Sequence, residues 1–302
     1  MSGETCYRLF GLIVKSELSL PEALIAPAGV AAHVFVRRGE VDPGGITGAR
    51  RRGPFVWAAA GVLWFSVPDV ARFLVRDGRE IIVDARPGVD EDRVRAFLLG
   101  SAMGALLAQR GTMVLHGNAI VDDDGCLACV GPSGAGKSTL AAEFMRRGHQ
   151  VLSDDLVPLD EECRVLPGIP RLKLLPDAVA RLQVAAEELR PIRPGLTKFD
   201  YPLGAAFATQ AIPLRVVYVL ARGGRDPGIT ITTLRGMECL VPLRANTYRV
   251  GFVDALGLLP DHLDRCGRLA RQAQVKVVSL PSSLPTPAEV VDALLADAAG
   301  DN

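Results

Sequence analysis

A helical stripe of apolar and small side chains is the clearest pattern in the chain, and it lies between residues 90 and 109. These side chains recur at the i, i+3, i+4, i+7 spacing that places them on one face of a helix: Val94, Phe97, Leu98, Ser101, Ala102, Ala105 and Leu106. Gly111 follows and is suited to ending the helix. We assign residues 91–110 to a helix that connects two parts of the chain and packs on the sheet of the second part.

Residues 1–90 carry strand patterns separated by turn residues. Asp77-Gly78, inside the strand pattern Arg72–Val83, has the composition of a tight turn. Apolar and β-prone residues dominate four runs: Cys6–Ile13, Ala32–Arg38, Val56–Phe65 and Arg72–Val83. The pattern predicts a small β-rich N-terminal domain over residues 1–90.

Residues 111–302 alternate strand patterns with helical ones, which is typical of an α/β domain. The predicted strands are Ala119–Val121, Cys126–Val130, Gln150–Ser153, Leu214–Ala221 and Val275–Leu280. The predicted helices are Lys137–Arg147, Pro176–Leu189, Leu259–Gln274 and a last one that opens at the capping box Thr286-Pro-Ala-Glu289. Between them, Arg190–Leu203 has no regular pattern and is basic. We expect one larger domain over residues 111–302.

The composition is that of a folded protein with a sizeable core. Of 302 residues, 49% are hydrophobic and 23% are charged. Lysine plus arginine equals aspartate plus glutamate at 34 each, so no net charge attracts nucleic acid or an anionic membrane. We expect neither as a partner.

The cytoplasm is the expected compartment. The longest apolar runs fall short of the ~18 residues of a membrane helix, and the start Met-Ser-Gly-Glu-Thr-Cys has no basic stretch followed by an apolar one, so no signal peptide is expected. The six cysteines are too scattered for a disulfide framework. Cys126-x-x-Cys129 has the spacing of a redox or zinc pair, but it lies inside a predicted strand, so we interpret both as core residues.

Candidate chemistry begins with a glycine-rich segment that fits G-x-x-x-x-G-K-[ST] at every position. Its backbone N–H groups would surround the phosphates of a nucleotide, Lys137 would place a charge on them, and the Ser138 hydroxyl would ligate Mg²⁺. The predicted nucleotide-binding residues are Gly131, Pro132, Ser133, Gly134, Ala135, Gly136, Lys137, Ser138 and Thr139.

The flanks of this segment separate it from a glycine-rich surface turn. Cys126–Val130 is a predicted strand directly before it, and Lys137–Arg147 is a predicted helix directly after it. Gly148 is well placed to end that helix. The motif therefore stands between a strand and a helix N-terminus, which favours anions, and we predict that a nucleoside triphosphate binds there.

Asp154 and Asp155 follow the predicted strand Gln150–Ser153, sixteen residues after Ser138. Phosphoryl transfer to an alcohol needs a carboxylate for the metal and a base for the acceptor proton. Because neighbouring side chains of a strand point to opposite faces, we expect one aspartate to face Mg²⁺ and the other the acceptor. The alternative is a solvated pair at the end of a strand.

Three other polar residues need an interpretation. His116, before Gly117, is either a structural residue or one that contacts the transferred phosphoryl group. His149 is explained by capping the preceding helix. Thr197-Lys198-Phe199-Asp200 fits a guanine-recognition pattern, but the motif order is wrong for a GTPase, so we interpret Lys198 as a base that meets a phosphate.

His116-Gly117, Gly131–Ser138, Arg147-Gly148-His149 and Ser153-Asp154-Asp155 together resemble the catalytic domain of the HPr kinase/phosphorylase family, which is related to bacterial PEP carboxykinases. The whole chain is similar in character to the HPr-kinase-like proteins of peptide natural-product clusters, among them lasso-peptide kinases. The resemblance implies an α/β P-loop kinase domain with a mixed sheet flanked by helices, and Mg²⁺ and ATP as cofactors.

The same resemblance implies roles for single residues. Asp154 would be the general base that deprotonates an acceptor serine. His116 would assist near the transferred phosphoryl group, and Lys137 would bind phosphate. Ser138 and Asp155 would lie around Mg²⁺. The resembling enzymes form hexamers, which leaves a homo-oligomer open here.

The sequence thus predicts a kinase that phosphorylates a serine of a peptide or protein, with a lasso-peptide precursor as one such substrate. A kinase for small hydroxyl compounds is the first alternative. A regulator that binds ATP without catalysis is the second, but it would need only one metal-binding aspartate.

Overall fold

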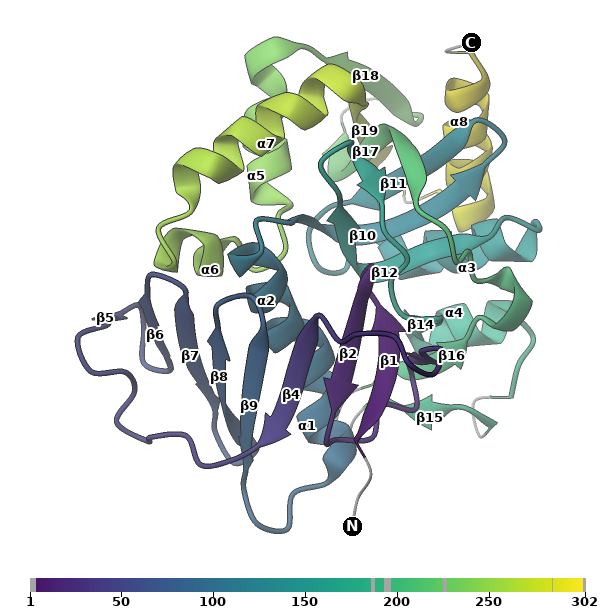
Figure 1. Ribbon diagram of the computed structural model, residues 1–302. Coiled ribbons are helices and arrows are strands. Elements are labelled where there is room, and N and C mark those ends of the chain that lie inside the picture. The colour runs from purple at the N-terminus through teal and green to yellow at the C-terminus, as the bar shows by residue number, and fades with distance from the viewer. Residues whose placement is uncertain (1–3, 186–187, 193–196, 225–226, 284, 301–302) are drawn as a thin grey trace.

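The computed structural model describes residues 4–185, 188–192, 197–224, 227–283 and 285–300. Strands of the first part of the chain form one nine-stranded sheet, at the lower left of Figure 1. In spatial order its strands are β3 (Leu24–Ile25), β1 (Thr5–Leu9), β2 (Leu12–Ser16), β4 (Val34–Arg38), β9 (Glu80–Ala85), β8 (Ala71–Arg76), β7 (Val62–Val67), β6 (Val56–Ala59) and β5 (Arg50–Arg51).

Three of the four strand runs predicted here are hairpins. The run Cys6–Ile13 turns at Phe10 and Gly11, whose φ angles are 55° and 73°. The sequence gives little sign of this turn, because phenylalanine rarely adopts a positive φ; burial of the Phe10 ring in the core holds it there. The run Val56–Phe65 likewise divides at Gly61. The predicted turn at Asp77-Gly78 is confirmed, with positive φ at both residues.

The helical stripe forms three joined segments: α1 (Glu91–Phe97), a π-helical stretch (Leu98–Ala102) and α2 (Met103–Gln109). Its apolar face lies in the core of the nine-stranded sheet, and that core also reaches Val114 and Leu156 of the second sheet. We had expected the helix to pack on the second sheet alone. It packs on both sheets. Gly100 and Gly104 matter here, because a Cβ at either position would lie 3.0 Å or less from the Tyr248 ring or its hydroxyl.

The second sheet is mixed and carries helices on both faces. Its strands, in spatial order, are β11 (Gly125–Val130), β10 (Met113–Asp122), β12 (Val151–Leu159), β13 (Arg164–Val165), β17 (Ile212–Gly224), β19 (Gln274–Pro281) and β18 (Thr230–Leu234). β11 also pairs with β17 in parallel, so the first five of these strands close on one another. The predicted α/β class with a mixed, helix-flanked sheet is confirmed.

Two hydrophobic cores cover the two faces of this sheet. One contains side chains of α3 (Lys137–Arg146) and α8 (Pro287–Gly300), and the other those of α7 (Leu259–Gln272) and α5 (Leu240–Ala245). α6 (Val250–Ala255) joins the core of the first sheet. Short 3₁₀ turns lie at Gly204–Ala206 and Gly236–Cys239. The capping box at Thr286 is confirmed, since its N–H and hydroxyl both reach Glu289 Oε2.

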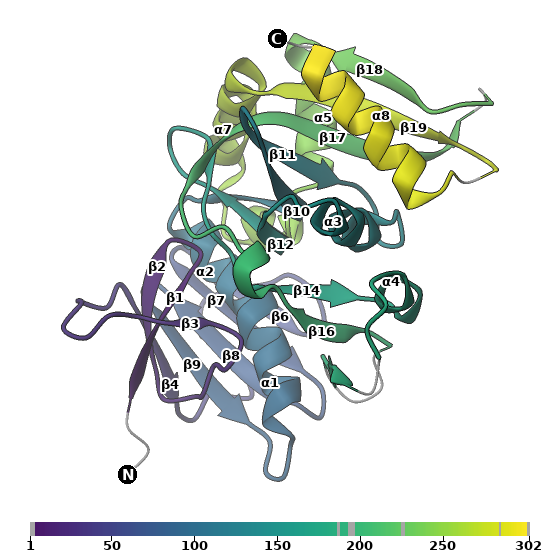
Figure 2. The same ribbon diagram turned by 90° about the vertical axis from the view of Figure 1, so that its right-hand side faces the viewer.

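A small third sheet lies between the two large ones, as Figure 2 shows. It consists of β14 (Arg171–Leu174), β16 (Phe199–Pro202) and β15 (Arg190–Pro191), in that order. The segment predicted to be irregular, Arg190–Leu203, thus contains two strands, although its residues 193–196 lie outside the described residues. The predicted helix Pro176–Leu189 is wrong from Leu182 to Ala185, because α4 (Pro176–Arg181) ends where Gln183 adopts a φ of 57°. Residues 186–187 of that prediction lie outside the described residues.

In the described part of the chain, no helix combines the length and apolar character needed to span a bilayer.

Candidate active site

The predicted strand–loop–helix arrangement is present around the glycine-rich segment. β11 ends at Val130 and α3 begins at Lys137. The glycines at 131, 134 and 136 have φ angles of 151°, 81° and 97°, which other residues rarely adopt. At Gly131 the space is also closed, because a Cβ would lie 2.9 Å from the carbonyl oxygen of Leu220 on β17. The loop backbone is therefore held tightly against the sheet.

The N-terminus of α3 opens into this loop without a side-chain cap. Its first N–H groups and the helix dipole give it a partial positive charge. Lys137 Nζ adds a full charge and donates to the carbonyl oxygens of Gly131 and Pro132 at 2.7 and 3.1 Å. The amide of Asn118 donates to the Lys137 carbonyl at 2.5 Å and ties the helix to β10. The loop thus presents donors and positive charge to one point.

The far end of α3 is as predicted. Gly148 has a φ of 93°, its N–H bonds to the Met145 carbonyl, and the next N–H, from His149, bonds to the Phe144 carbonyl. This pair of bonds is the Schellman motif. The His149 ring also lies 3.1 Å from the Val121 carbonyl oxygen through Nδ1, so it links the helix end to β10.

β10 brings the loop and the two aspartates together. It pairs with β11 on one side and with β12 on the other. Gly117 lies opposite Asp155, and Asn118 lies opposite Asp154. Only glycine fits at 117, because a Cβ there would be 2.3 Å from the Cys129 carbonyl oxygen. Gly117 therefore has a structural reason: without a side chain it lets β11, which leads into the loop, approach β10 closely.

Asp154 and Asp155 lie in the middle of β12 rather than at its end, because buried residues continue the strand to Leu159. We had expected their side chains to face opposite ways, but this is wrong: both line the same hollow. Asp155 adopts a φ of 72°, which breaks the alternation of the strand. The left-handed residue thus brings two neighbouring carboxylates to one side.

Lys173 of β14 contacts both carboxylates. Its N–H donates to Asp154 Oδ2 at 2.8 Å, and its Nζ donates to Asp155 Oδ2 at 2.5 Å. Burial and the neighbouring Asp155 charge raise the pKa of Asp154 to about 6. Burial would raise the pKa of Asp155 too, but Lys173 outweighs it and brings the pKa of Asp155 to about 2. Two adjacent carboxylates thus have different affinities for a proton.

His116 completes this group from β10. Its Nδ1 lies 3.1 Å from the Asp155 carbonyl oxygen and 3.4 Å from Asp155 Oδ1. Burial lowers the pKa of His116 in spite of the nearby carboxylate, so the neutral ring is favoured. The Tyr248 ring lies 5.6 Å away, centroid to centroid. A half-buried neutral imidazole at this place can donate or accept a hydrogen bond.

These groups line a hollow of about 200 Å³. Four of its lining residues are cationic and two are acidic: Lys137, Lys173, Lys198, Arg222, Asp154 and Asp155. The positive excess favours a ligand with several negative charges. A second hollow, of about 740 Å³, shares His116, Ser133 and Asp155 with the first, and Tyr248 and Arg249 lie on its wall. The two hollows form one continuous cleft.

The residues present fit a magnesium-bound triphosphate. The loop offers N–H groups and Lys137 to phosphate oxygens, and oxygen ligands for Mg²⁺ are available from Ser138 and Asp155. In addition, Asn118 Oδ1 is buried and has no donor among the described residues. A buried acceptor without a donor is costly, and it lies between the loop and Asp154. Asn118 is fully buried and lines neither hollow, so it supports the loop from behind the cleft.

Most of the site residues predicted from the sequence thus lie in one cleft: the loop, His116, Asp154, Asp155 and Lys198. The two cysteines are core residues, as predicted. Cys126 and Cys129 are fully buried in cores on opposite faces of the sheet, and burial raises the pKa of the Cys129 thiol to about 12. In the guanine-like motif, the Asp200 carboxylate accepts a hydrogen bond from Arg171 at 2.8 Å. Asp200 does not line the cleft.

Sequence reasoning missed Lys173, Asn118 and Arg222. Lys173 had a signal, because Arg171-Leu172-Lys173-Leu174 alternates charged and apolar residues as a two-faced strand does. Arg222 lies near the end of β17, the parallel neighbour of β11, so the strand order would have placed it. Asn118 had no signal in its own segment.

Among the comparisons with known proteins, only those with solved structures give a likeness. No family model matches the chain, and no curated protein matches it. Among solved structures, the chain is similar to one described as the Hpr(Ser) kinase/phosphatase from Coxiella burnetii, with 15% identity, 62% of this chain and 97% of that chain covered, and a TM-score of 0.34. A likeness of this size carries no information about function.

Proposed function

We propose that the protein is an ATP- and Mg²⁺-dependent kinase that transfers the γ-phosphoryl group to a serine hydroxyl of a peptide or protein. One observation carries the proposal. A glycine-rich loop at a helix N-terminus, two adjacent carboxylates and four cationic side chains line a single hollow. This combination is what positioning and charge stabilisation of a phosphoryl group require.

The loop residues and Lys137 hold the phosphates, and Lys198 and Arg222 face the same space. Asp155 is ionised and fixed by Lys173, which suits it to hold a cation together with Ser138. When bound, Mg²⁺ would neutralise charge that develops on the phosphate oxygens. The protein's own contribution is to fix the γ-phosphorus in front of the acceptor.

Asp154 acts as the base in the transfer step. It accepts the proton of the serine hydroxyl, whose oxygen forms a bond to the γ-phosphorus while the bond from that phosphorus to the bridging oxygen of ADP breaks. The N–H of Lys173 orients the carboxylate of Asp154 through Oδ2. His116, next to Asp155, offers a hydrogen bond to the transferred group.

The shape of the cleft favours a peptide over a small molecule as the acceptor. Beyond His116 the hollow widens to about 740 Å³ and is bordered by Asn246, Thr247 and Tyr248. A kinase for small hydroxyl compounds would instead be expected to close around its acceptor. The width is the reason to place the peptide first.

The test is transfer of labelled phosphate from ATP to serine-containing peptides, with free serine and sugars as competing acceptors. We expect peptide-dependent transfer that stops when Mg²⁺ is chelated. Asp154→Asn should abolish transfer at every Mg²⁺ concentration, whereas Asp155→Asn should leave transfer that needs a higher Mg²⁺ concentration. Asp123→Asn, in the exposed turn after β10, is the matched control.

Each other outcome has a defined meaning. If Asp155→Asn abolishes transfer at every Mg²⁺ concentration and Asp154→Asn raises the Mg²⁺ requirement, the roles of the two aspartates are exchanged. Transfer to free serine or sugar alone would replace the peptide by a small acceptor. Tight ATP binding without transfer to any acceptor would contradict the kinase assignment.

A further inference from the structure

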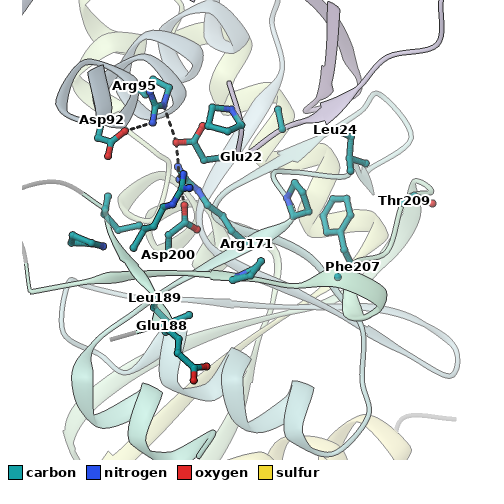
Figure 3. A pocket seen from close by; sticks show the side chains of 18 residues that line it. Glu22, Leu24, Asp92, Arg95, Arg171, Glu188, Leu189, Asp200, Phe207 and Thr209 are labelled. Atoms are coloured by element: carbon teal, nitrogen blue, oxygen red, sulfur yellow. Dashed lines mark hydrogen bonds and ion pairs between the residues drawn. The ribbon is translucent and has the colours of Figure 1, made fainter. Parts of the chain in front are cut away.

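A second cavity, of about 530 Å³, lies where the first sheet, α1 and the small sheet meet. Figure 3 shows Glu22 and Leu24 of the N-terminal part on one side of it and Arg171 and Asp200 of the small sheet on the other. It continues into a hollow of about 290 Å³ that shares Leu24, Phe207 and Thr209 with it. We call these two hollows together the groove. None of the groove residues belongs to the cleft.

A chain of ion pairs forms the charged side of the groove, as the dashed lines in Figure 3 show. Arg95 pairs with Asp92 and with Glu22, and Arg171 pairs with Asp200 at 2.8 Å and lies 3.7 Å from Glu22. Both arginine side chains are less than 10% exposed. Because both already pair with carboxylates, they offer little attraction to an anionic ligand.

One atom of this network lacks a partner. Glu22 Oε2 is buried and accepts no hydrogen bond within the described residues, although Glu22 Oε1 accepts one from Arg95 Nε at 3.0 Å. A buried carboxylate oxygen without a donor is costly, and a cationic side chain or an N–H group brought into the groove would satisfy it. The groove is therefore suited to a donor rather than an acceptor.

The remaining walls are mostly apolar, apart from Arg8, His33, Glu188, Arg190 and Thr209. Two of these walls are the outer strands of sheets. Leu24 comes from β3, at the end of the nine-stranded sheet, and Pro191 from β15, at the end of the small sheet. Pro202 and Phe207 add further apolar surface. An apolar, elongated groove bordered by strand edges accommodates an extended chain.

The groove leads toward the cleft along one face of the small sheet. Arg171 borders the groove and Lys173 borders the cleft, and these two residues lie on the same face of β14. Asp200 on the paired strand β16 borders the groove, and Lys198, directly before β16, borders the cleft. Two residues along a strand span about 7 Å. An extended chain that lies in the groove can therefore enter the cleft along one face of the small sheet.

We propose that the groove docks an extended segment of the peptide acceptor, in which an arginine or lysine lies between apolar residues. The basic side chain reaches Glu22, and the apolar neighbours contact Leu24 and Phe207. This proposal rests on the proposed function only in naming the bound segment as part of the acceptor. Docking itself requires neither ATP nor transfer.

The test measures docking without nucleotide. The probe is a fluorescein-labelled peptide with one arginine between two valine–leucine pairs, and its twin has glutamate in place of arginine; fluorescence anisotropy gives their affinities for the full chain. We expect the arginine peptide to bind about tenfold or more tightly than the glutamate twin. Glu22→Gln should weaken the arginine peptide about tenfold and bring the two peptides closer.

A second variant guards against misfolding of Glu22→Gln. Thr209 is exposed at the junction of the two hollows, so Thr209→Arg blocks the groove without touching the buried network. It should also weaken binding about tenfold or more. Thr209→Ser and Glu40→Gln, the latter at an exposed site outside the groove, are the controls and should bind like the unaltered chain.

Four outcomes each overturn the proposal. The arginine peptide does not bind, the two peptides bind equally, the glutamate twin binds more tightly, or Thr209→Arg binds the arginine peptide like the unaltered chain. Labelled ATP is titrated against the same proteins in parallel. If the unaltered chain does not bind ATP, the proposed function is contradicted but the docking proposal is not. Retained ATP binding and transfer without peptide docking would contradict the groove alone.

Discussion

The cleft and the groove lie along one face of the small sheet, yet they treat charge in opposite ways. In the cleft, Lys137, Lys198 and Arg222 exceed what the two aspartates neutralise. In the groove, Arg95 and Arg171 are matched by carboxylates and buried with them. The cleft thus holds positive charge ready for a ligand, whereas the groove uses its positive charge internally.

The difference predicts how each region responds to substitution. Removing a charge from the cleft should lower catalysis with little loss of stability, because that charge is directed at a ligand. Removing a charge from the groove network should lower stability, because its partner is then left buried and unpaired. Arg171 and Lys173, two residues apart on β14, provide the sharpest test.

Lys137→Met should have the largest effect. Without this ammonium group the loop loses its charge on the phosphates, and transfer should fall on the order of 10³-fold, as for other charge-stabilising groups. The measurement is steady-state transfer of labelled phosphate, with Arg181→Ala at an exposed helix end as control. If Lys137→Met retains transfer, the positive charge of the cleft does not serve a phosphate ligand, and the cleft and the groove do not differ in this respect.

Arg171→Met should instead lower the free energy of unfolding by about 3 kcal/mol, because Asp200 and Glu22 lose a buried counter-charge. Urea denaturation measures this loss. Labelled ATP should still bind below the unfolding range. If Arg171→Met together with Asp200→Asn is no more stable than Arg171→Met alone, the unpaired carboxylate is not the cause of the loss.

Lys173→Met should give the reverse pattern on the same strand. Its backbone N–H still orients Asp154, but Asp155 loses its ammonium partner. We expect turnover to fall about tenfold or more, as when a group that supports a metal ligand is removed. The free energy of unfolding, measured by the same denaturation, should change less than for Arg171→Met. A larger loss of stability than of turnover would contradict the division between cleft and groove.

Asp92→Asn should have the smallest effect. Asp92 pairs with Arg95 at the rim, and its side chain is 43% exposed, so solvent screens the pair. The free energy of unfolding should change by about 0.5 kcal/mol or less. A loss comparable with that of Arg171→Met would show that the network acts as one unit up to its exposed end.

The parts of the fold and site that the sequence predicts well are those fixed by local chemistry. The glycine-rich loop between β11 and α3, the helix end at Gly148 and the turn at Asp77-Gly78 all depend on residues close in the chain. The parts that it does not predict depend on tertiary packing. Phe10 turns because its ring is buried, and Lys173 reaches Asp155 only because β14 lies beside β12.

The direction of the two aspartates belongs to the second group. Strand alternation predicted opposite faces for Asp154 and Asp155, and the positive φ of Asp155 overrides it. No neighbouring residue indicates this, although aspartate is several-fold enriched among the non-glycine residues that adopt a positive φ. The roles of both aspartates, of His116 and of Ser138 remain predictions.

The backbone of Asp155 also has a consequence for protein engineering. A residue other than glycine in the left-handed region costs on the order of 1 kcal/mol, and this one lies in the middle of a strand. Glycine at 155 would remove that strain and would rank high in a search for thermostable variants. The stabilised protein would lack the carboxylate that Lys173 and His116 surround. At this position, therefore, a gain in heat resistance and the retention of activity are opposing design goals.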